Sequence, residues 1–487
     1  MALYFLARGL FLLRALFLLP VNIKWYNVDM TINSSIFKAY DIRGIYPEQL
    51  NEQGAYAIAR AYATLMIKEN PGKQLTIAVG ADMRTSSPSL KEQVVKAITD
   101  SGLDVADIGL VSTPTFYFGV AFYGYDGGVQ VSASHNPKQY NGLKMTRKNA
   151  VPISGDTGIQ DLYKMVNEES YAPIGEQKGK VTMREHVVED EAADQSKEVD
   201  IIKIKPLKIV VDACNAMGGV DVEAMFAGLP INLIKMNFGL DGTFPVHEAD
   251  PMKDENTADL RKRVVEEKAD LGIAPDGDGD RLFFVDEKGE MVPQPILRGL
   301  MAQIELRDHP GATVAYDIRP GKITADMIAA GGGKPVVTRV GHSLIKETMI
   351  KEGAIFGGES SGHYFYKRPY GVFEMPMILT LKLLKYISEQ DRPFSEILAP
   401  FKKYFNSGEI NTKLDSREVA TAKIEQIKQK YADGQINLLD GISVEYPDYW
   451  FSVRASNTEP VLRLIVEART QETMEQKRDE LLSLIRS

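Results

Sequence analysis

A short apolar run, a polar loop and an amphipathic stretch follow one another repeatedly along this chain, and this order most constrains its fold. Residues 75–84 (LTIAVGADMR), 208–219 (KIVVDACNAMGG) and 312–321 (ATVAYDIRPG) each resemble a strand that ends in a polar loop, and each precedes a plausible helix. Strands that alternate with helices form α/β layers. The spacing, roughly a hundred residues, favours three related α/β units over a short solenoid repeat.

The pattern changes after Pro393. Residues 421–434 have a helical period, residues 442–468 alternate like strands, and a charged helix closes the chain, which predicts a small α+β domain. The fold class is therefore α/β, with three related α/β domains plus a C-terminal α+β domain. The expected divisions are an apolar extension at 1–30, then domains at 31–180, 181–292, 293–400 and 401–487.

Composition excludes several classes of protein. The 487 residues carry 57 Lys+Arg against 66 Asp+Glu, a net charge of −9, so no basic face for nucleic acid is expected. Charged residues at 25% and hydrophobic residues at 44% argue against broad disorder. The single cysteine, Cys214, forms neither an intrachain disulfide nor a Cys-based zinc site. This cysteine usage fits a reducing compartment, so the cytoplasm is the expected location.

The first 20 residues are strongly apolar but are interrupted by Arg8 and Arg14. A spanning helix needs about 20 mostly apolar residues, and a signal peptide carries its charge before the apolar run. Neither pattern is present, so no stable membrane insertion is expected. Domain-like sequence begins just after Met30, which favours a mis-assigned start or a non-native leader; a membrane-surface helix is the alternative.

The sharpest local motif is DGDGDR at residues 276–281, which follows the apolar run LGIAP. Glycines between the carboxylates let the backbone turn tightly, so that three acidic side chains can converge on one hard cation. An EF-hand is a competing interpretation, because Glu287 stands at its twelfth position; however, Arg281 stands where that loop needs glycine. A solvated acidic turn is a further alternative. A magnesium site that engages a phosphate is the preferred interpretation.

Two loops combine hydroxyls with imidazoles. In VSASHNPKQYNGLK (131–144), Ser134 and His135 follow a strand, outside any nucleophile-elbow pattern; a turn-capping pair is the alternative to an exposed nucleophile. In GGESSGHYFY (357–366), Glu359, Ser361 and His363 occupy alternate positions and would point the same way in extended backbone. That set suits adjacent sugar hydroxyls, and a polar surface turn is the alternative.

Three further motifs, each taken alone, are weaker indications of a functional site. RASNTEPVLR (454–463) offers hydroxyls, an amide and the Arg454 fork to an anion, or else forms a capped turn between strands. AYDIRG (39–44) contains Arg43, and TRVGHSLIK (338–346) places His342 after a glycine. A lone histidine is more often a hydrogen-bonded structural residue.

Together and in this order, SASHNP, DGDGDR, GESSGH and RASNTEP, with AYDIRG ahead of them, resemble the α-D-phosphohexomutase superfamily, specifically its phosphomannomutase/phosphoglucomutase branch. The resemblance covers nearly the whole chain from about Phe37. It implies four domains around a central cleft, with one loop from each domain meeting there.

The resemblance also implies roles for residues. The phosphorylated serine falls on Ser134, and the magnesium ligands are implied to be Ser134, through its phosphate, with Asp276, Asp278 and Asp280. Sugar contacts fall on Glu359, Ser361 and His363. Phosphate contacts fall on Arg454, Ser456, Asn457 and Thr458. Residues that line the reaction centre are Arg43, Lys144, Arg281 and His342, and Lys144 and His342 are both candidates for the general base. Arg319 replaces a lysine expected in this branch, and an arginine fork is not equivalent to an ammonium at a phosphate.

The activity so implied interconverts hexose 1-phosphate and hexose 6-phosphate, of mannose and/or glucose. It proceeds through phospho-Ser134 and a hexose 1,6-bisphosphate, which also serves as activator, with Mg²⁺ as cofactor and hexose phosphates as the expected small-molecule partners. Asn457 leans toward mannose or glucose substrates, by family pattern. The alternatives are a phosphoglucosamine mutase, a sugar-phosphate phosphatase and a non-catalytic sugar-phosphate sensor, which would be expected to have lost Ser134 or an aspartate.

Overall fold

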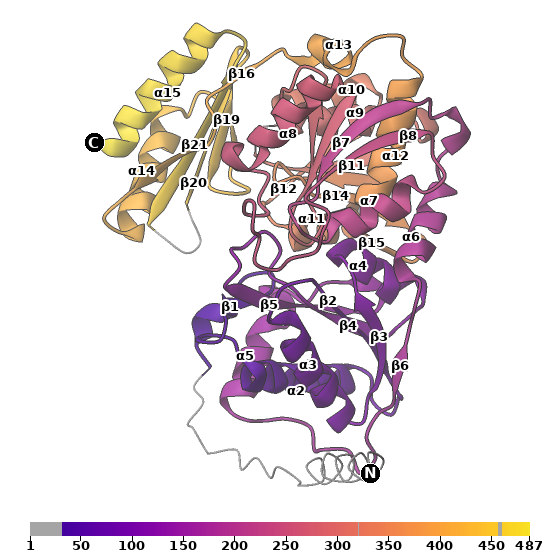
Figure 1. The fold of residues 1–487 in the computed structure, drawn as a ribbon. Helices are drawn as coiled ribbons and strands as arrows, with labels where there is room; N and C mark the ends of the chain where they lie inside the picture. Colours follow the sequence, from indigo (N-terminus) through magenta and orange to yellow (C-terminus); the bar gives the residue numbers. More distant parts are fainter. Residues whose placement is uncertain (1–31, 320, 456–459) are drawn as a thin grey trace, which may run out of the picture. The chain divides into compact units, whose positions relative to one another are not determined.

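The computed structural model describes residues 32–319, 321–455 and 460–487, apart from the side chain of residue 156. Residues Ser34–Ser487 form one compact unit, which contains four sheets in chain order (Figure 1). In the part of the chain that is described, no helix is both long and apolar enough to cross a membrane.

The first sheet has six strands in the order β1-β5-β4-β2-β3-β6. Its strands are β1 (Ile42–Ile45), β2 (Thr76–Ala81), β3 (Asp104–Leu110), β4 (Gly127–Val131), β5 (Tyr140–Arg147) and β6 (Val181–Met183). Its helices are α2 (Glu52–Glu69), α3 (Ser87–Asp100), α4 (Thr113–Phe122) and α5 (Ile159–Asn167). Pro88 lies in the first turn of α3, where its missing N–H costs no hydrogen bond.

β6 pairs with β3, so the first sheet extends to Met183, past the predicted boundary at 180. All three residues of β6 are exposed, and polar residues flank it. An exposed edge strand has no buried face, so it carries no alternation of apolar and polar residues for a sequence pattern to detect. The helix α6 (Val187–Ser196) then leads to the second sheet.

The second and third sheets repeat one plan. The second has the order β10-β9-β7-β8 and the third β12-β11-β13-β14-β15. The strands are β7 (Leu207–Asp212), β8 (Ile231–Met236), β9 (Leu271–Pro275), β10 (Leu282–Asp286), β11 (Thr313–Asp317), β12 (Lys334–Thr338), β13 (Phe356–Gly358), β14 (Tyr364–Arg368) and β15 (Gly371–Glu374). The helices are α7 (Gly218–Phe226), α8 (Asp254–Glu267), α9 (Gln294–Asp308), α10 (Lys322–Ala330), α11 (His342–Glu352), α12 (Pro376–Ser388) and α13 (Phe394–Leu398).

The fourth sheet is antiparallel throughout, in the order β16-β21-β20-β19-β18 with β17 also on β21. Its elements are β16 (Phe405–Asn406), β17 (Ile410–Lys413), α14 (Arg417–Lys430), β18 (Gln435–Asn437), β19 (Ile442–Glu445), β20 (Tyr449–Ala455), β21 (Val461–Ala468) and α15 (Gln471–Arg486). Three α/β domains and a C-terminal α+β domain are thus confirmed. Short 3₁₀ turns complete the chain: η1 (Ser34–Ile36), η2 (Lys148–Ala150), η3 (Gly155–Thr157), η4 (Ile201–Lys203) and η5 (Ala399–Phe401).

The hydrophobic core is divided unequally among the domains. One continuous cluster runs through the first three, from Phe116 and Phe118 on α4 to Ile209 on β7 and Leu379 on α12. The fourth domain packs a cluster of its own, with Phe451 and Leu464 at its centre. Burial of apolar surface therefore ties the first three domains to one another more strongly than to the fourth.

Candidate active site

Three loops occupy the same topological position in the first three sheets. Each sheet has three parallel strands followed by an antiparallel fourth, and the turn into that fourth strand carries a motif. We call these turns the serine loop (132–139, between β4 and β5), the aspartate loop (276–281, between β9 and β10) and the glutamate loop (359–363, between β13 and β14). Contacts between the loops bring motifs from three domains into one site.

Ser134 lies in the serine loop against the aspartate loop. Its Oγ donates to Oδ2 of Asp276 at 3.0 Å and lies 3.1 Å from Nδ1 of His135. The residue is buried and has a φ of 51°, a left-handed conformation that few non-glycine residues adopt. Burial and the Arg281 guanidinium hold the pKa of His135 far below its usual value, so this imidazole is neutral.

Arg84, which the sequence motifs missed, holds the serine loop in place. Its guanidinium donates to the carbonyl oxygens of Ser134, Asn136, Pro137 and Tyr140 at 2.6–3.0 Å. The side chain is fully buried and pairs with Asp82, which directly follows β2. A charged residue soon after a β-branched strand was the only available signal, because the four acceptors are main-chain atoms that no motif records.

Asp276, Asp278 and Asp280, here called the aspartate triad, are buried with carboxylate oxygens within 4.8 Å of one another. Burial, and then Asp280 and Asp278, raise the pKa of Asp276. Among the described residues, Oδ1 of Asp278 has no hydrogen-bond partner although it is buried. Three converging carboxylates and one orphaned oxygen fit a hard cation such as Mg²⁺.

The EF-hand alternative is wrong. Oε2 of Glu287, which would close such a loop, accepts instead from the main-chain N–H of Ser395 at the start of α13, at 3.0 Å. Residues 282–286 form β10, which pairs with β9. The strand that follows the aspartate loop therefore carries Glu287 away from the triad.

Lys144 projects from β5 of the first domain to the triad in the second. Its Nζ donates to Oδ2 of Asp278 at 2.7 Å and to Oδ2 of Asp280 at 2.6 Å. Although burial opposes it, these two carboxylates hold the pKa of the ammonium well above its usual value. Lys144 is thus a cation that neutralises part of the charge of the triad.

The glutamate loop contacts the triad through His363. Its Nε2 lies 3.2 Å from Oδ1 of Asp280, and its Nδ1 lies 2.9 Å from Oε2 of Glu359. Although burial opposes it, the Asp280 carboxylate, together with hydrogen bonds to Asp280 and Glu359, raises the pKa of His363 to about 9. The ring is therefore an imidazolium between two carboxylates. Ser361 adds a hydroxyl 3.0 Å from Nδ1 of the same ring.

Three arginines surround these loops. Arg43 donates to Oδ1 of Asn136 at 2.7 Å and pairs with Asp41. Arg281 lies with Nε 3.4 Å from Nε2 of His363. Arg319 pairs with Asp317, and its Nη2 lies 3.4 Å from Oγ of Ser361. The predicted residues of the first three domains described so far thus lie together around the three loops.

His342 begins α11 and packs edge-on against Tyr40, with ring centroids 5.5 Å apart. Its ring centroid lies 6.0 Å from that of His363, so it is part of the same assembly. Burial, and then the nearby Lys346 and Lys144, hold the pKa of His342 well below its usual value. Tyr40, which no motif argument selected, donates its O–H to the carbonyl oxygen of Val340 at 2.9 Å.

The fourth domain contributes Arg454 at the end of β20. It donates to Glu409 at 2.9 Å and to Asp440 at 3.3 Å, and Asp440 also accepts from the main-chain N–H of Val340 at 3.5 Å. Arg454 is thereby linked to the segment that carries His342. The predicted Ser456, Asn457 and Thr458 lie outside the described residues.

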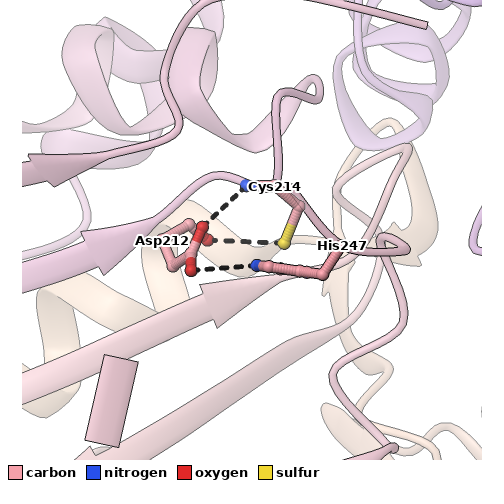
Figure 2. A group of neighbouring side chains, drawn as sticks. All are labelled: Asp212, Cys214 and His247. Atoms are coloured by element: carbon pink, nitrogen blue, oxygen red, sulfur yellow. Dashed lines mark hydrogen bonds and ion pairs between the residues drawn. The ribbon is translucent and has the colours of Figure 1, made fainter. Parts of the chain in front are cut away.

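A second group with ligand-type side chains is Asp212, Cys214 and His247 (Figure 2). Nε2 of His247 lies 3.1 Å from Oδ2 of Asp212, and its Nδ1 lies 2.9 Å from the carbonyl oxygen of Glu248. The hydrogen bond to Asp212 raises the pKa of His247. Nδ1 faces a carbonyl oxygen, which can only accept, so Nδ1 carries a proton, and Nε2 faces the Asp212 carboxylate.

Cys214 completes this group as a support for the aspartate loop. Its thiol lies 3.7 Å from the carbonyl oxygen of Pro275, the residue before Asp276, and its main-chain N–H donates to Asp212 at 3.0 Å. Burial raises the pKa of the thiol far above its usual value. A neutral buried thiol is a packing residue rather than a nucleophile.

Four family models match the chain in succession. They are the phosphoglucomutase/phosphomannomutase alpha/beta/alpha domain I at residues 34–172, domain II at 189–289, domain III at 296–404 and the C-terminal domain at 409–484. The chain belongs to the phosphoglucomutase/phosphomannomutase family. The serine, aspartate and glutamate loops fall in domains I, II and III of this family in that order.

Individual members of the family are similar to this chain over most of their length. A phosphomannomutase of Escherichia coli is 40% identical over 92% of this chain and 99% of its own. A phosphomannomutase/phosphoglucomutase of Pseudomonas syringae pv. tomato is 36% identical over 92% and 94%. A crystal structure of a phosphoglucomutase/phosphomannomutase family protein from Burkholderia thailandensis superposes with a TM-score of 0.85 at 32% identity, over 93% and 97%. The chain is thus a hexose-phosphate mutase homologue, and the alternative activities are not favoured.

Proposed function

We propose that this chain interconverts hexose 1-phosphate and hexose 6-phosphate, of mannose and/or glucose, by way of phospho-Ser134 and a hexose 1,6-bisphosphate. The observation that carries the proposal is the placement of Ser134 Oγ 3.0 Å from Asp276 of the triad, with Lys144 on the other two carboxylates. A hydroxyl beside a cation site is the arrangement that phosphoryl transfer requires, because that chemistry depends on positioning and charge neutralisation.

Ser134, Asp276, Asp278 and Asp280 would hold Mg²⁺, which when bound supplies charge neutralisation for the transferring phosphoryl group. In the forward step, the bond between Ser134 Oγ and phosphorus breaks, and a bond forms between phosphorus and the free sugar hydroxyl oxygen. That hydroxyl loses its proton to a base of the chain. The bisphosphate then reorients and returns its other phosphoryl group to Ser134, so no phosphate is gained or lost overall.

We assign the base to His342 and the charge-neutralising role to Lys144. His342 is neutral, because burial and nearby cations depress its pKa, and a neutral imidazole accepts a proton. Lys144 carries its proton already, held by two carboxylates. The surroundings of Lys144 and His342 thus give these two candidate bases different protonation states.

Binding of the sugar and of the non-reacting phosphate would fall to different domains. Glu359, Ser361 and His363 offer an acceptor, a hydroxyl and a donor within one loop, a set that matches neighbouring sugar hydroxyls. Arg454, with Ser456, Asn457 and Thr458, would hold the distal phosphate. The three arginines Arg43, Arg281 and Arg319 would add bidentate donors around the reaction centre.

The setting we propose is the cytoplasm, with hexose phosphates as the small-molecule partners and hexose 1,6-bisphosphate as activator. The domain limits at 31–180, 181–292, 293–400 and 401–487, and an extension at 1–30 outside the catalytic unit, stay predictions.

A coupled assay tests the proposal. Wild-type protein and Ser134→Ala receive mannose 1-phosphate, glucose 1-phosphate or glucosamine 1-phosphate, with Mg²⁺ and a trace of the matching bisphosphate. We expect conversion of the first two sugars and its loss in Ser134→Ala, with phosphate on Ser134 of the wild type by mass spectrometry. Preference for the glucosamine substrate, net phosphate release, or no turnover by folded wild type would each contradict it.

A further inference from the structure

A buried chain of charges stands behind His342. Glu374 ends β15 with no exposed surface, and its Oε2 accepts from Nζ of Lys346 at 2.8 Å. Lys346 lies on α11 one turn after His342, is equally buried, and has its Nζ 4.1 Å from the ring centroid of Tyr117. The same Nζ lies 5.8 Å from the ring centroid of Phe365. An ammonium that pairs with one carboxylate and otherwise faces aromatic rings fixes the orientation of that carboxylate firmly.

The other oxygen of Glu374 faces His342. Oε1 lies 3.7 Å from Nδ1 of His342. Among the described residues, neither of these two buried atoms has a hydrogen-bond partner. A buried acceptor and a buried ring nitrogen without other partners satisfy each other if the imidazole carries its proton on Nδ1 and closes by less than about 1 Å. Nε2 makes no hydrogen bond to a described residue and is the nitrogen left to meet a ligand.

We propose that Glu374 is a positioning residue that holds His342 in the tautomer protonated at Nδ1, so that the Nε2 lone pair accepts the proton of the attacking sugar hydroxyl. This inference rests on the base role assigned to His342 in the proposed function. Lys346 directs Glu374 in turn, and Tyr117 of the first domain covers Lys346. Tyr117 of the first domain therefore influences the orientation of His342 indirectly, through Lys346 and Glu374.

The other groups near His342 leave Glu374 as its one acceptor. Lys346, Lys144 and the His363 imidazolium are donors, and Asp280 acts through space rather than through a hydrogen bond to this ring. Tyr40 meets the ring with its edge and donates its O–H to Val340 instead. No other described carboxylate forms an ion pair with His342.

Glu374→Gln provides a sharp test because the protonated side chain of Lys346 only donates. The amide oxygen must turn toward Lys346, which places the amide N–H₂ group against Nδ1 of His342. A donor at that position forces the proton onto Nε2 and removes the lone pair from the reacting side. We expect kcat to fall by roughly 10²–10⁴-fold, the contribution of a general base, with KM changed by less than about threefold.

Two further variants make the test specific. In Lys346→Met/Glu374→Gln the amide is free to turn its oxygen to His342, so we expect kcat to recover at least about tenfold over Glu374→Gln alone. Glu305→Gln is the matched control, since Glu305 is another buried glutamate of the third domain, is paired with Lys382 at 2.6 Å and forms no ion pair with a predicted site residue among those described. It should leave kcat and KM unchanged.

The tautomer is read directly by ¹⁵N NMR of histidine-labelled protein, where six histidines make assignment by single substitution practical. We expect a protonated Nδ1 in the wild type, a protonated Nε2 in Glu374→Gln and restoration of Nδ1–H in the double variant. A wild type protonated at Nε2 overturns the inference without any variant. An unchanged tautomer in folded Glu374→Gln, or a loss of kcat matched by Glu305→Gln, overturns it too. Failure of the proposed function is distinguishable, because it would appear as absent wild-type turnover whichever tautomer is found.

Discussion

At the scale of single residues, the site is a set of buried charges that offset one another. His363 is the clearest case, since it lies between Asp280 and Glu359 from two different domains. Each carboxylate would be costly to bury alone, and the imidazolium between them removes that cost. Proton uptake by one ring therefore contributes to the stability of the whole assembly.

This arrangement predicts a pH dependence of stability in magnesium-free protein. The folded pKa of His363 is about 9, above its ordinary value of 6.5. The stabilisation is therefore complete below about pH 6.5 and is lost as the pH rises through about 9, with a size on the order of 3 kcal/mol. Thermal unfolding of wild type and His363→Gln in a chelator, from pH 5.5 to 10, measures it. The difference in Tm should shrink as pH rises, and a growing difference would contradict the ion pairing.

At the scale of elements, the three loops depend on how closely they approach one another. A Cβ placed on Gly277 would lie 2.4 Å from the carbonyl oxygen of Ser134, so only glycine lets the aspartate loop reach the serine loop. The main-chain N–H of Gly277 also donates to the carbonyl oxygen of Ala249 at 3.2 Å, which fixes the loop from the other side. The close approach of Ser134 to the triad thus depends on the absence of a side chain at Gly277.

Gly277→Ala should therefore lower kcat by about 100-fold or more, because a shift of roughly 1 Å is enough to misalign reacting groups. The matched control is Gly239→Ala in the same domain, where a new Cβ meets no atom within 4 Å. That variant should keep wild-type kcat. Steady-state rates with a check of Tm separate the two, and equal rates for both variants would show that the loops tolerate the shift.

At the scale of the whole molecule, the first three domains share a core and a reaction centre, while the fourth packs on its own. Between the third and fourth domains, Lys322 pairs with Glu445, and Asp440 accepts from Val340. These are polar contacts rather than a continuous apolar interface. Under the proposed function, the fourth domain is therefore the part most free to adjust as a bisphosphate reorients in the site.

Lys144 of the first domain forms ion pairs with the aspartate triad of the second domain. These ion pairs predict that the stability of the protein depends on magnesium. In Lys144→Met, buried Asp278 loses its cationic partner and buried Asp280 keeps only His363, so the free energy of unfolding without magnesium should fall by about 3–5 kcal/mol. Saturating Mg²⁺ should recover most of that loss, because the metal replaces the missing charge.

Lys382→Met is the control for this prediction. Its partner Glu305 lies in the third domain, so its cost should be the same with and without Mg²⁺. Denaturant unfolding of both variants, with chelator and with Mg²⁺, makes the comparison. A loss in Lys144→Met that magnesium does not change would mean that the triad does not bind the metal.

The sequence by itself determined the fold class and the family, and it predicted most of the residues that the structure brings together around the triad. Strand-to-loop junctions repeat along the chain, and a motif such as DGDGDR records its carboxylates in a short run of letters. These motifs consist of consecutive residues, so they can be recognised without the three-dimensional structure. The resemblance added the order in which the motifs belong together.

Only the tertiary structure decided which groups are charged and which atoms face one another. His342 is neutral and Lys144 is a cation because of burial and neighbours from other domains, so residue type alone left the base open. Arg84 acts on main-chain carbonyls, and Glu374 reaches His342 from a different strand of the third domain. Contacts of this kind depend on packing between distant segments, which no local pattern of letters encodes.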